Sequence, residues 1–359
     1  MALVLPLEFT YVNYAKHMWR FLANHFGDVR VVRVKDRLFP EINQDVLLLL
    51  ADKCGEVSLS VQFEAFENLS DVSDGKALAT AEVTVEKIEQ EEKAFQLALL
   101  KPALRKLISS SFNGLTEPAS RSADFRVGYV SGHKDYFHPS AETVKEFDLP
   151  QNSLVSAVSN ARKLRAKGLR TSKLPFEATD KLWCPSKDLT AGELSYKAFG
   201  EANGVHLGYK CAKRPEWYRV PGVKAPEAIA TVFSELPLVL LNDASFVASN
   251  SLLGIYVSRG SVEEFVARWY SSLTRLSILL NVHSLGGGVL VMVPNEAKLI
   301  EMPKAASPIS IDSIEEKLTS GDIRSVYAMQ DKWLEKEIGK NALKLVHEGI
   351  ETLNSWRAR

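Results

Sequence analysis

Few side chains in this sequence have the type and spacing that nucleophilic or metal-assisted catalysis needs. Serine is abundant, but no serine lies in a Gly-x-Ser-x-Gly turn, so a hydrolase of that class is not supported. His133 and His138 are five residues apart with Asp135 between them, a spacing that suits no standard zinc site. We therefore expect no metal here, and instead a turn or a contact with nucleic acid.

The residues that do gather are cations. One run has no acid among its members: Arg162, Lys163, Arg165, Lys167, Arg170 and Lys173. A second run has the single acid Glu216 among five cations: Lys210, Lys213, Arg214, Arg219 and Lys224. Because the chain has 44 basic and 44 acidic residues, the clustering and not the total charge indicates a surface for a phosphate backbone. A solvated basic surface is the alternative for either run alone.

Arginine can reach the major-groove edge of guanine with two hydrogen bonds, whereas lysine mostly neutralises phosphate. We therefore expect the first run to contact the DNA backbone and, through its arginines, the bases. Trp217 and Tyr218 lie inside the second run. We expect these two rings to anchor a strand in the core while the cations around them face outward.

The composition is that of an ordinary globular protein, with 46% hydrophobic and 25% charged residues. The 359 residues are enough for more than one domain. No apolar run reaches the length of about eighteen residues that a membrane span needs, and the apolar start lacks the basic region and cleavage site of a signal peptide. Three cysteines that lie far apart favour a reducing environment. We therefore expect a cytoplasmic protein.

The elements that must position the cations begin with an alternation of helix and strand. Residues 9–26 place apolar side chains at helical spacing, and Gly27 follows as the expected stop. Residues 29–34 form a β-branched run, and residues 46–50 are continuously apolar, as in a strand covered on both faces. Residues 77–88 alternate like a half-exposed strand. Together these segments predict part of an α/β sheet.

The sequence pattern changes in the middle of the chain. Residues 94–108 favour a helix with a turn or an end near Pro102. Residues 109–122 are rich in Gly, Pro, Ser and Asn, which is typical of a linker. Short strands, turns and basic loops are expected from there to about residue 303.

Two helical regions are expected in the later part of the chain. Ser261 and Glu264 have the spacing of a capping box. Apolar residues at helical spacing then predict one helix: Phe265, Trp269, Leu273, Leu276 and Leu280. The tail, residues 311–356, is amphipathic and helical, with breaks at Gly321 and Gly339.

Two groups of short segments carry a family resemblance. The first group comprises residues 2–9, 26–29, 37–40 and 46–50, and the second comprises residues 124–132, 213–221, 241–252, 270–274 and 284–290. In this order they resemble TaqI-like, gamma-class DNA adenine methyltransferases. The first group is similar to the segments downstream of the catalytic tetrapeptide in that family, and the second to its target-recognition region. The resemblance covers nearly all of residues 1–303.

The resemblance implies methyl transfer from S-adenosylmethionine to the exocyclic amino group of adenine in double-stranded DNA, in a restriction-modification or defence system. It also implies that Phe39 stacks on the target adenine once that base is flipped out of the duplex. The alternative for Phe39 is a core residue at a strand end. The expected DNA-binding residues are Arg162, Lys163, Arg165, Lys167, Arg170, Lys210, Lys213, Arg214 and Arg219.

Two motifs of the family are missing. Its donor site uses an acidic-Phe-x-Gly-x-Gly turn, and its chemistry uses Asn/Asp-Pro-Pro-Tyr/Phe. No two prolines are adjacent in this sequence, and the glycine run at residues 286–288 lies far downstream, where it suits a tight turn. A glycine turn lets the backbone approach the cofactor, and the tetrapeptide holds the adenine amino group in line for transfer. We therefore expect no catalytic residue and no methylation by this chain alone.

These patterns together predict an α/β fold in four parts. Residues 1–108 would be the distal part of a Rossmann-like methyltransferase domain, and residues 109–122 a linker. Residues 123–305 would be an α+β target-recognition domain, and residues 306–359 a C-terminal helical segment. The expected partners are double-stranded DNA and a separately encoded N-terminal catalytic half that binds S-adenosylmethionine. A non-catalytic DNA-binding specificity module and an inactive gene remnant are the alternatives.

Overall fold

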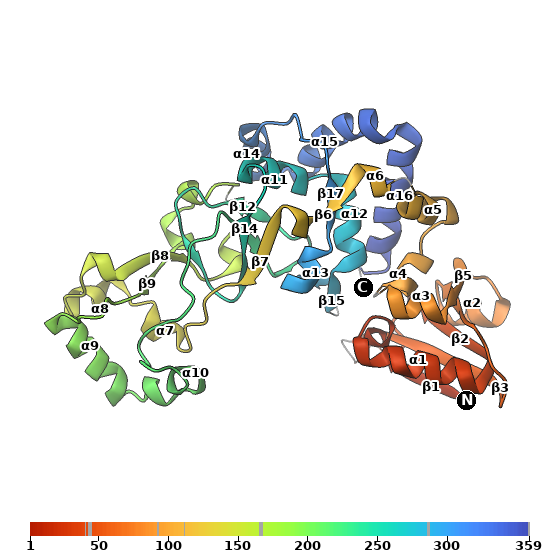
Figure 1. Ribbon diagram of the computed structural model, residues 1–359, viewed down its shortest axis with the longest axis horizontal. Coiled ribbons are helices and arrows are strands. Elements are labelled where there is room, and N and C mark those ends of the chain that lie inside the picture. Colours follow the sequence, from red (N-terminus) through yellow and green to blue (C-terminus); the bar gives the residue numbers. More distant parts are fainter. Residues whose placement is uncertain are drawn as a thin grey trace.

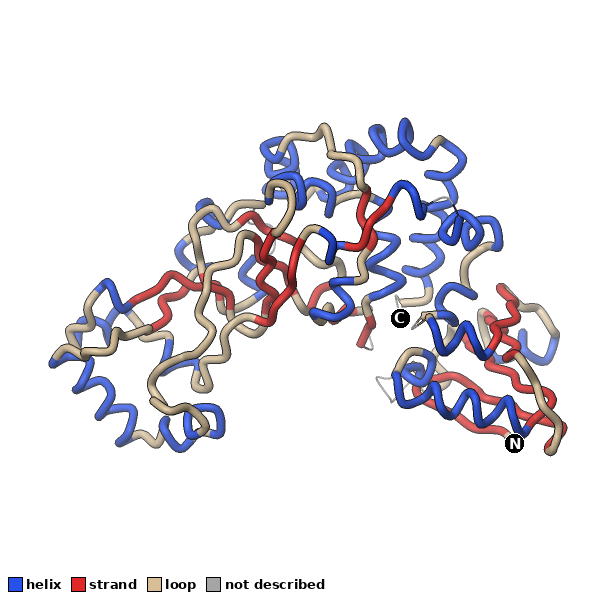
Figure 2. The backbone as a smooth tube through the Cα atoms, viewed as in Figure 1, coloured by secondary structure: helices blue, strands red, loops and turns tan. Residues whose placement is uncertain are grey.

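The computed structural model describes residues 1–39, 41, 45–91, 93–110, 112–164, 168–285 and 288–357. Its long axis runs from a five-stranded N-terminal sheet at one end to a small lobe, residues 129–226, at the other (Figure 1). Small sheets and helices fill the region between them, and the C-terminal helices lie against this central region (Figure 2).

The N-terminal sheet has the strand order β1-β3-β2-β4-β5. Its strands are β1 (Ala2–Pro6), β2 (Phe26–Val34), β3 (Val46–Cys54), β4 (Ser60–Phe66) and β5 (Ala79–Thr84). β2 and β4 are parallel, whereas β1 and β2 are each antiparallel to β3, and β4 is antiparallel to β5. β1, β2 and β4 therefore run in the same direction, and their carboxyl ends lie at one edge of the sheet.

One face of this sheet shares a core with the helix α1 (Asn13–His25), which follows the 3-10 turn η1 (Leu7–Thr10). Trp19 is 1% exposed, and its indole N–H donates to the carbonyl of Phe9 at 3.0 Å. The helix predicted over residues 9–26 is thus confirmed. The expectation for Gly27 is wrong, because the chain passes directly into β2 at Phe26 and Gly27 lies inside that strand.

The opposite face carries a smaller apolar cluster. Val32, Val34 and Phe66 are buried there, near the helix α2 (Leu69–Asp74). Leu3 and Val4 of β1 are 41% and 50% exposed. Within the described residues β1 pairs only with β3, so its other side is an open edge whose backbone groups can accept a further strand.

Residues 85–122 form a series of short elements that join the sheet to the central region. These are α3 (Val85–Gln90), α4 (Ala94–Ala98), α5 (Pro102–Ser110), α6 (Phe112–Leu115), β6 (Thr116–Pro118) and the 3-10 turn η2 (Ala119–Arg121). α5 begins at Pro102, where the break was expected. β6 pairs with β17 (Glu301–Pro303), and Phe112 is buried in the main core. The segment expected as a linker is therefore packed.

The central region contains two sheets, in the orders β12-β10-β14-β7 and β11-β16-β15. Their strands are β7 (Ala123–Val127), β10 (Ala228–Thr231), β11 (Phe233–Ser234), β12 (Val239–Leu241), β14 (Leu252–Val257), β15 (His283–Leu285) and β16 (Val289–Val291). The helices are α11 (Val262–Trp269), α12 (Ser272–Asn281) and α13 (Pro294–Lys298).

The helix expected after Ser261 is two helices. Ser261 accepts the backbone N–H of Glu264, as the capping pattern predicts. A second cap follows, because the Ser271 hydroxyl accepts the backbone N–H of Thr274 at 3.2 Å and starts α12. The apolar spacing continues through this break, which is why periodicity alone did not reveal it.

The small lobe has its own aromatic core. It contains the helices α7 (Lys134–Phe137), α8 (Ala141–Glu146), α9 (Ala191–Ala202) and α10 (Tyr209–Ala212) and the strands β8 (Leu154–Val158) and β9 (Asp180–Trp183). The strand β13 (Val247–Ala248), which lies outside residues 129–226, pairs with β8 and completes this sheet. The rings of Tyr136 and Tyr196 stack with centroids 4.6 Å apart. Each hydroxyl donates to the backbone carbonyl of the other tyrosine, which satisfies two buried polar groups.

The tail forms α14 (Ile311–Thr319), α15 (Ile323–Ile338) and α16 (Lys340–Ser355). The breaks predicted at Gly321 and Gly339 are confirmed, with φ angles of 75° and 84° that favour glycine. The Arg33 guanidinium lies 4.9 Å from the ring centre of Trp356, so the N-terminal sheet contacts the tail.

The fold is thus a mixed α/β arrangement of several small sheets and helices, in agreement with the expected class. Among the described helices, none combines the length and the apolar composition that crossing a bilayer requires.

Candidate nucleic-acid interface

The first cation run lies on residues 160–174, which contain the 3-10 turns η4 (Ala161–Leu164) and η5 (Thr171–Lys173). Arg170 forms ion pairs with Glu315 and, at 2.9 Å, with Asp312, both on α14. Lys173 reaches the same Glu315 carboxylate at 3.0 Å. The Glu315 side chain is only 5% exposed, so its charge requires these cations. Arg170 therefore clamps the run to α14.

Asp243 holds the same segment from a second side. Its carboxylate accepts a hydrogen bond from the backbone N–H of Ser172 at 2.8 Å, and it accepts further hydrogen bonds from the hydroxyls of Ser172 and Thr171. Burial raises the pKa of Asp243, but these hydrogen bonds together outweigh burial and hold that pKa below its usual range. The acids that neutralise this run are thus remote from it in the sequence.

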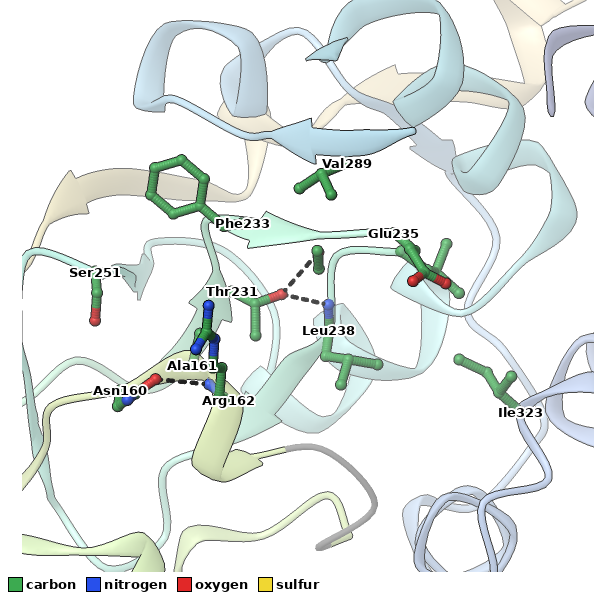
Figure 3. A pocket seen from close by; sticks show the side chains of 12 residues that line it. Asn160, Ala161, Arg162, Thr231, Phe233, Glu235, Leu238, Ser251, Val289 and Ile323 are labelled. Atoms are coloured by element: carbon green, nitrogen blue, oxygen red, sulfur yellow. Dashed lines mark hydrogen bonds between the residues drawn. The ribbon is translucent and has the colours of Figure 1, made fainter. Parts of the chain in front are cut away.

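Arg162 has a different environment. Its side chain is exposed and forms no ion pair within the part of the chain that the structure describes, and its backbone N–H donates to Asn160 Oδ1 at 2.9 Å. It lies on the wall of a cleft of about 800 Å³, which Phe233 and Glu235 also line (Figure 3). The Lys163 side chain, Arg165 and Lys167 lie outside the described residues.

The two arginines of the second cation run make internal contacts. Arg214 donates to the carbonyls of Val130 at 2.7 Å and Ser131 at 2.8 Å, and burial lowers the pKa of its guanidinium. Arg219 donates to the Ser186 carbonyl at 2.8 Å and pairs with Glu216 at 2.9 Å. Both arginines hold loops of the small lobe together.

The lysines of the second run face outward. Lys210 and Lys213 are exposed and form no ion pair among the described residues. Their ammonium nitrogens lie 5.6 and 6.0 Å from the ring centre of Tyr209, which is 73% exposed. Two of the three exposed lysines of this run therefore lie beside an exposed aromatic ring on α10, and the third, Lys224, lies 5.0 Å from the ring centre of Tyr256.

The aromatic residues of the second run are structural, as expected, but they lie in a turn and not in the expected strand. Tyr218 is 9% exposed, and its ring centre lies 6.2 Å from that of buried Trp183. Trp217 packs on Tyr136 at 5.5 Å and donates its indole N–H to Glu201 at 3.1 Å. These rings extend the aromatic core of the small lobe.

Phe39 lies in the N-terminal part, five residues beyond the end of β2. It is 42% exposed, whereas its neighbour Leu38 packs against the cluster of Val32 and Val34. The carboxyl ends of β1, β2 and β4 lie at this edge of the mixed sheet. Phe39 is thus an exposed ring and does not have the burial of a core residue.

The glycine run is the feature of the sequence most like a methyl-donor cradle, but Gly288, its described member, packs against Arg357 and does not form such a cradle. Its carbonyl accepts a hydrogen bond from Arg357 at 2.6 Å, and a Cβ at Gly288 would lie 3.1 Å from the Arg357 carbonyl oxygen. The glycine there permits close packing of two backbones, as the turn interpretation predicted.

Several residues of this surface were not selected from the sequence. Tyr209 and Leu207 are exposed beside the second run, and their position next to Lys210 was a usable signal. Phe233 lines the cleft beside Arg162 and had no such signal. Glu315 and Asp243 compensate the positive charge of the first run, although each lies more than seventy positions away from its partners in the sequence. No local sequence pattern shows such pairs.

Comparison with known proteins places this architecture in a family. Residues 91–334 match the model of the type II methyltransferase M.Eco57I, C-terminal domain. No curated protein sequence matches the chain. The solved structure of the type IIL restriction-modification enzyme MmeI in complex with DNA is similar, with a TM-score of 0.53, 9% identity and coverage of 99% of this chain and 50% of that one.

The type IIG restriction endonuclease BpuSI is a second structural neighbour, with a TM-score of 0.47, 13% identity and coverage of 99% of this chain and 46% of that one. The chain spans about half the length of these two structures. The family match covers more than half of the chain, and it includes the small lobe, both cation runs and most of the central region. The chain belongs to the family of type II methyltransferase C-terminal domains related to M.Eco57I.

Proposed function

We propose that this chain is the DNA-recognition and base-flipping half of an S-adenosylmethionine-dependent adenine methyltransferase of a restriction-modification or defence system. The observation that carries the proposal is the family match over residues 91–334, which includes the exposed Lys210 and Lys213. Uncompensated lysines on a preformed surface are suited to a phosphate backbone. MmeI, which resembles this chain in fold, is described in complex with DNA.

In this proposal the DNA contacts are unequal. Arg162, Lys210 and Lys213 are exposed and carry the direct contacts, together with Lys163, whose side chain is not described, and with Arg165 and Lys167, which lie outside the described residues. Arg170, Arg214 and Arg219 act by holding the loops that present those contacts, because their guanidinium groups already have internal partners.

The N-terminal sheet is interpreted as the distal part of a Rossmann-like catalytic domain. The open edge of β1 with its exposed Leu3 and Val4 supports this interpretation, since a partner strand would cover it. Phe39 would stack on the flipped adenine beyond the carboxyl ends of β1, β2 and β4, because ligands bind at that edge in open α/β sheets and the exposed face of Phe39 is accessible there. A separately encoded catalytic half would supply the donor site and the Asn-Pro-Pro-Tyr type motif that this sequence lacks.

The absence of both motifs from the sequence also favours a second candidate, a specificity module that binds DNA without catalysis. An inactive gene remnant is the third interpretation of the same absence. A reading frame that ends after Asn-Pro-Pro-Tyr just upstream of the Met1 codon would support the split enzyme over both. Binding of DNA without methylation would support the specificity module, and loss of DNA binding would support the remnant.

The test is equilibrium binding of the chain to a fluorescent duplex over a series of salt concentrations. We expect duplex binding that weakens steeply with salt, because lysine–phosphate contacts release counterions. Changing Arg162, Lys163 and Arg165 to alanine is expected to weaken it further. Binding that does not respond to salt, or that is unchanged in this variant, would refute the proposed interface.

A further inference from the structure

The segment that joins α9 to the second cation run has exposed residues between two buried ones. Val205 in the 3-10 turn η7 (Val205–Leu207) is 4% exposed and Cys211 is fully buried, so these two side chains anchor the segment in the core. Leu207 and Tyr209, which lie between them, are 72% and 73% exposed. Packing of the small lobe therefore does not require these two large apolar side chains. Exposed apolar side chains that adjoin one another mark a contact surface.

This segment is held rigidly. The Arg214 guanidinium, just after α10, bonds to the carbonyls of Val130 and Ser131 on the adjacent loop. Gly132 of that loop fits closely against α10, since a Cβ there would lie 3.0 Å from Cys211 Sγ and 3.1 Å from Lys210 Cβ. Little backbone conformational entropy is therefore lost when this segment meets a partner.

The charges on this segment select the kind of partner. Lys210 and Lys213 lie close to the Tyr209 ring and form no ion pair within the described part of the chain. Two positive charges therefore lie next to the exposed Leu207 and Tyr209 side chains. A purely apolar protein partner would bury or crowd these charges. A DNA groove satisfies both features, because its phosphate rims take cations while its floor offers base edges and thymine methyl groups to apolar side chains.

We propose that residues 207–213 form a preformed element that enters a groove of duplex DNA, with Leu207 and Tyr209 on the base edges and Lys210 and Lys213 on the phosphates. This inference rests on the proposed function and adds to it two contact residues of a different chemistry. The lysines supply affinity that does not depend on the DNA sequence. Leu207 and Tyr209 contact the base edges, so their contribution depends on which bases form the groove floor.

Two double variants separate these roles by the salt dependence of duplex binding, measured by fluorescence anisotropy. Lys210→Ala with Lys213→Ala is expected to reduce the slope of log K against log salt by about 1.8, because each of the two lysine–phosphate contacts contributes about 0.9. Leu207→Ala with Tyr209→Ala is expected to weaken binding roughly tenfold without changing the slope, since both truncated side chains bind through apolar surface and not through charge.

Matched controls come from equally exposed residues elsewhere. Lys336→Ala with Lys344→Ala removes two exposed lysines from α15 and α16, and Phe176→Ala removes a ring on the small lobe that is 85% exposed. Both controls are expected to bind DNA as the unaltered chain does. All variants change exposed side chains, and an unfolding curve for each verifies that the fold is retained.

The outcomes separate this inference from the proposed function. If the unaltered chain does not bind duplex DNA, the proposed function fails. If the chain binds and the apolar variant binds equally well, the groove element is refuted while the proposed function stands. If the apolar variant loses affinity but the lysine variant keeps the full salt slope, the assignment of the phosphate contacts is overturned.

Discussion

Replacing Glu315 by glutamine tests whether the first cation run is held in place by α14. The Glu315 side chain is 5% exposed and contacts both Arg170 and Lys173. Removing one partner of a buried ion pair generally costs about 3–5 kcal/mol. For Glu315→Gln we expect a smaller loss of unfolding free energy, about 2–3 kcal/mol. Lys173 is largely exposed, and Arg170 retains its ion pair with Asp312 at 2.9 Å.

The matched control is Asp312→Asn. Asp312 also pairs with Arg170, but its side chain is 84% exposed, so its loss is expected to cost less than about 1 kcal/mol. Urea denaturation of both variants, of Arg170→Gln and of the Glu315→Gln/Arg170→Gln double variant measures the free energy of unfolding and the coupling between the pair. A cost for Glu315→Gln no larger than that for Asp312→Asn, or no coupling to Arg170, would refute the clamp.

Two further predictions concern the residues that hold the two cation runs in place, and a third concerns the methyl donor. Because the folded-state pKa of Asp243 lies below its unfolded value, its carboxylate stabilises the fold at neutral pH, and this contribution is lost as the pH falls below about 4 and through the folded-state pKa. The destabilisation by Asp243→Asn in urea should therefore shrink in acid, and an undiminished difference would contradict this. Arg214→Lys should cost roughly 2 kcal/mol of unfolding free energy, because lysine cannot reproduce the paired bonds to two carbonyls, whereas Lys213→Ala should stay within about 0.5 kcal/mol. Calorimetry with S-adenosylmethionine should give no saturable heat, and clear binding would argue against a separate catalytic half.

Local patterns predicted elements well where one face alternates clearly. The helix after residue 9 and the three tail helices with breaks at Gly321 and Gly339 were all visible in the sequence. Caps that lie within a continuous apolar pattern were not. α11 ends at Trp269 and Ser271 caps the start of α12, while the spacing of apolar residues continues unchanged.

The packed segment 109–122 shows a second limit. Its Gly, Pro and Ser content is typical of a linker, but Phe112 and the pairing of β6 with β17 draw it into the main core. That pairing joins residues more than 180 positions apart, and neither strand has a local signal strong enough to predict it.

The candidate site was predictable as a set of residue types but not as a set of roles. Clustering located Lys210 on α10 and Lys213 just after it, the two exposed lysines that the proposed interface uses there. Clustering could not separate Arg170 and Arg214, which have internal partners, from Lys210, which forms no ion pair among the described residues, because the partners of the arginines are distant in sequence. Charge alone reports where a surface is basic, whereas the fold decides which charges remain accessible.

The central claim is that this chain reads a DNA sequence. Selection of duplexes from a random library on the immobilised chain, followed by sequencing, tests it most directly. Our account predicts enrichment of one short motif, which is lost when Leu207 and Tyr209 are both changed to alanine. Retention of duplexes without any enriched motif would contradict it.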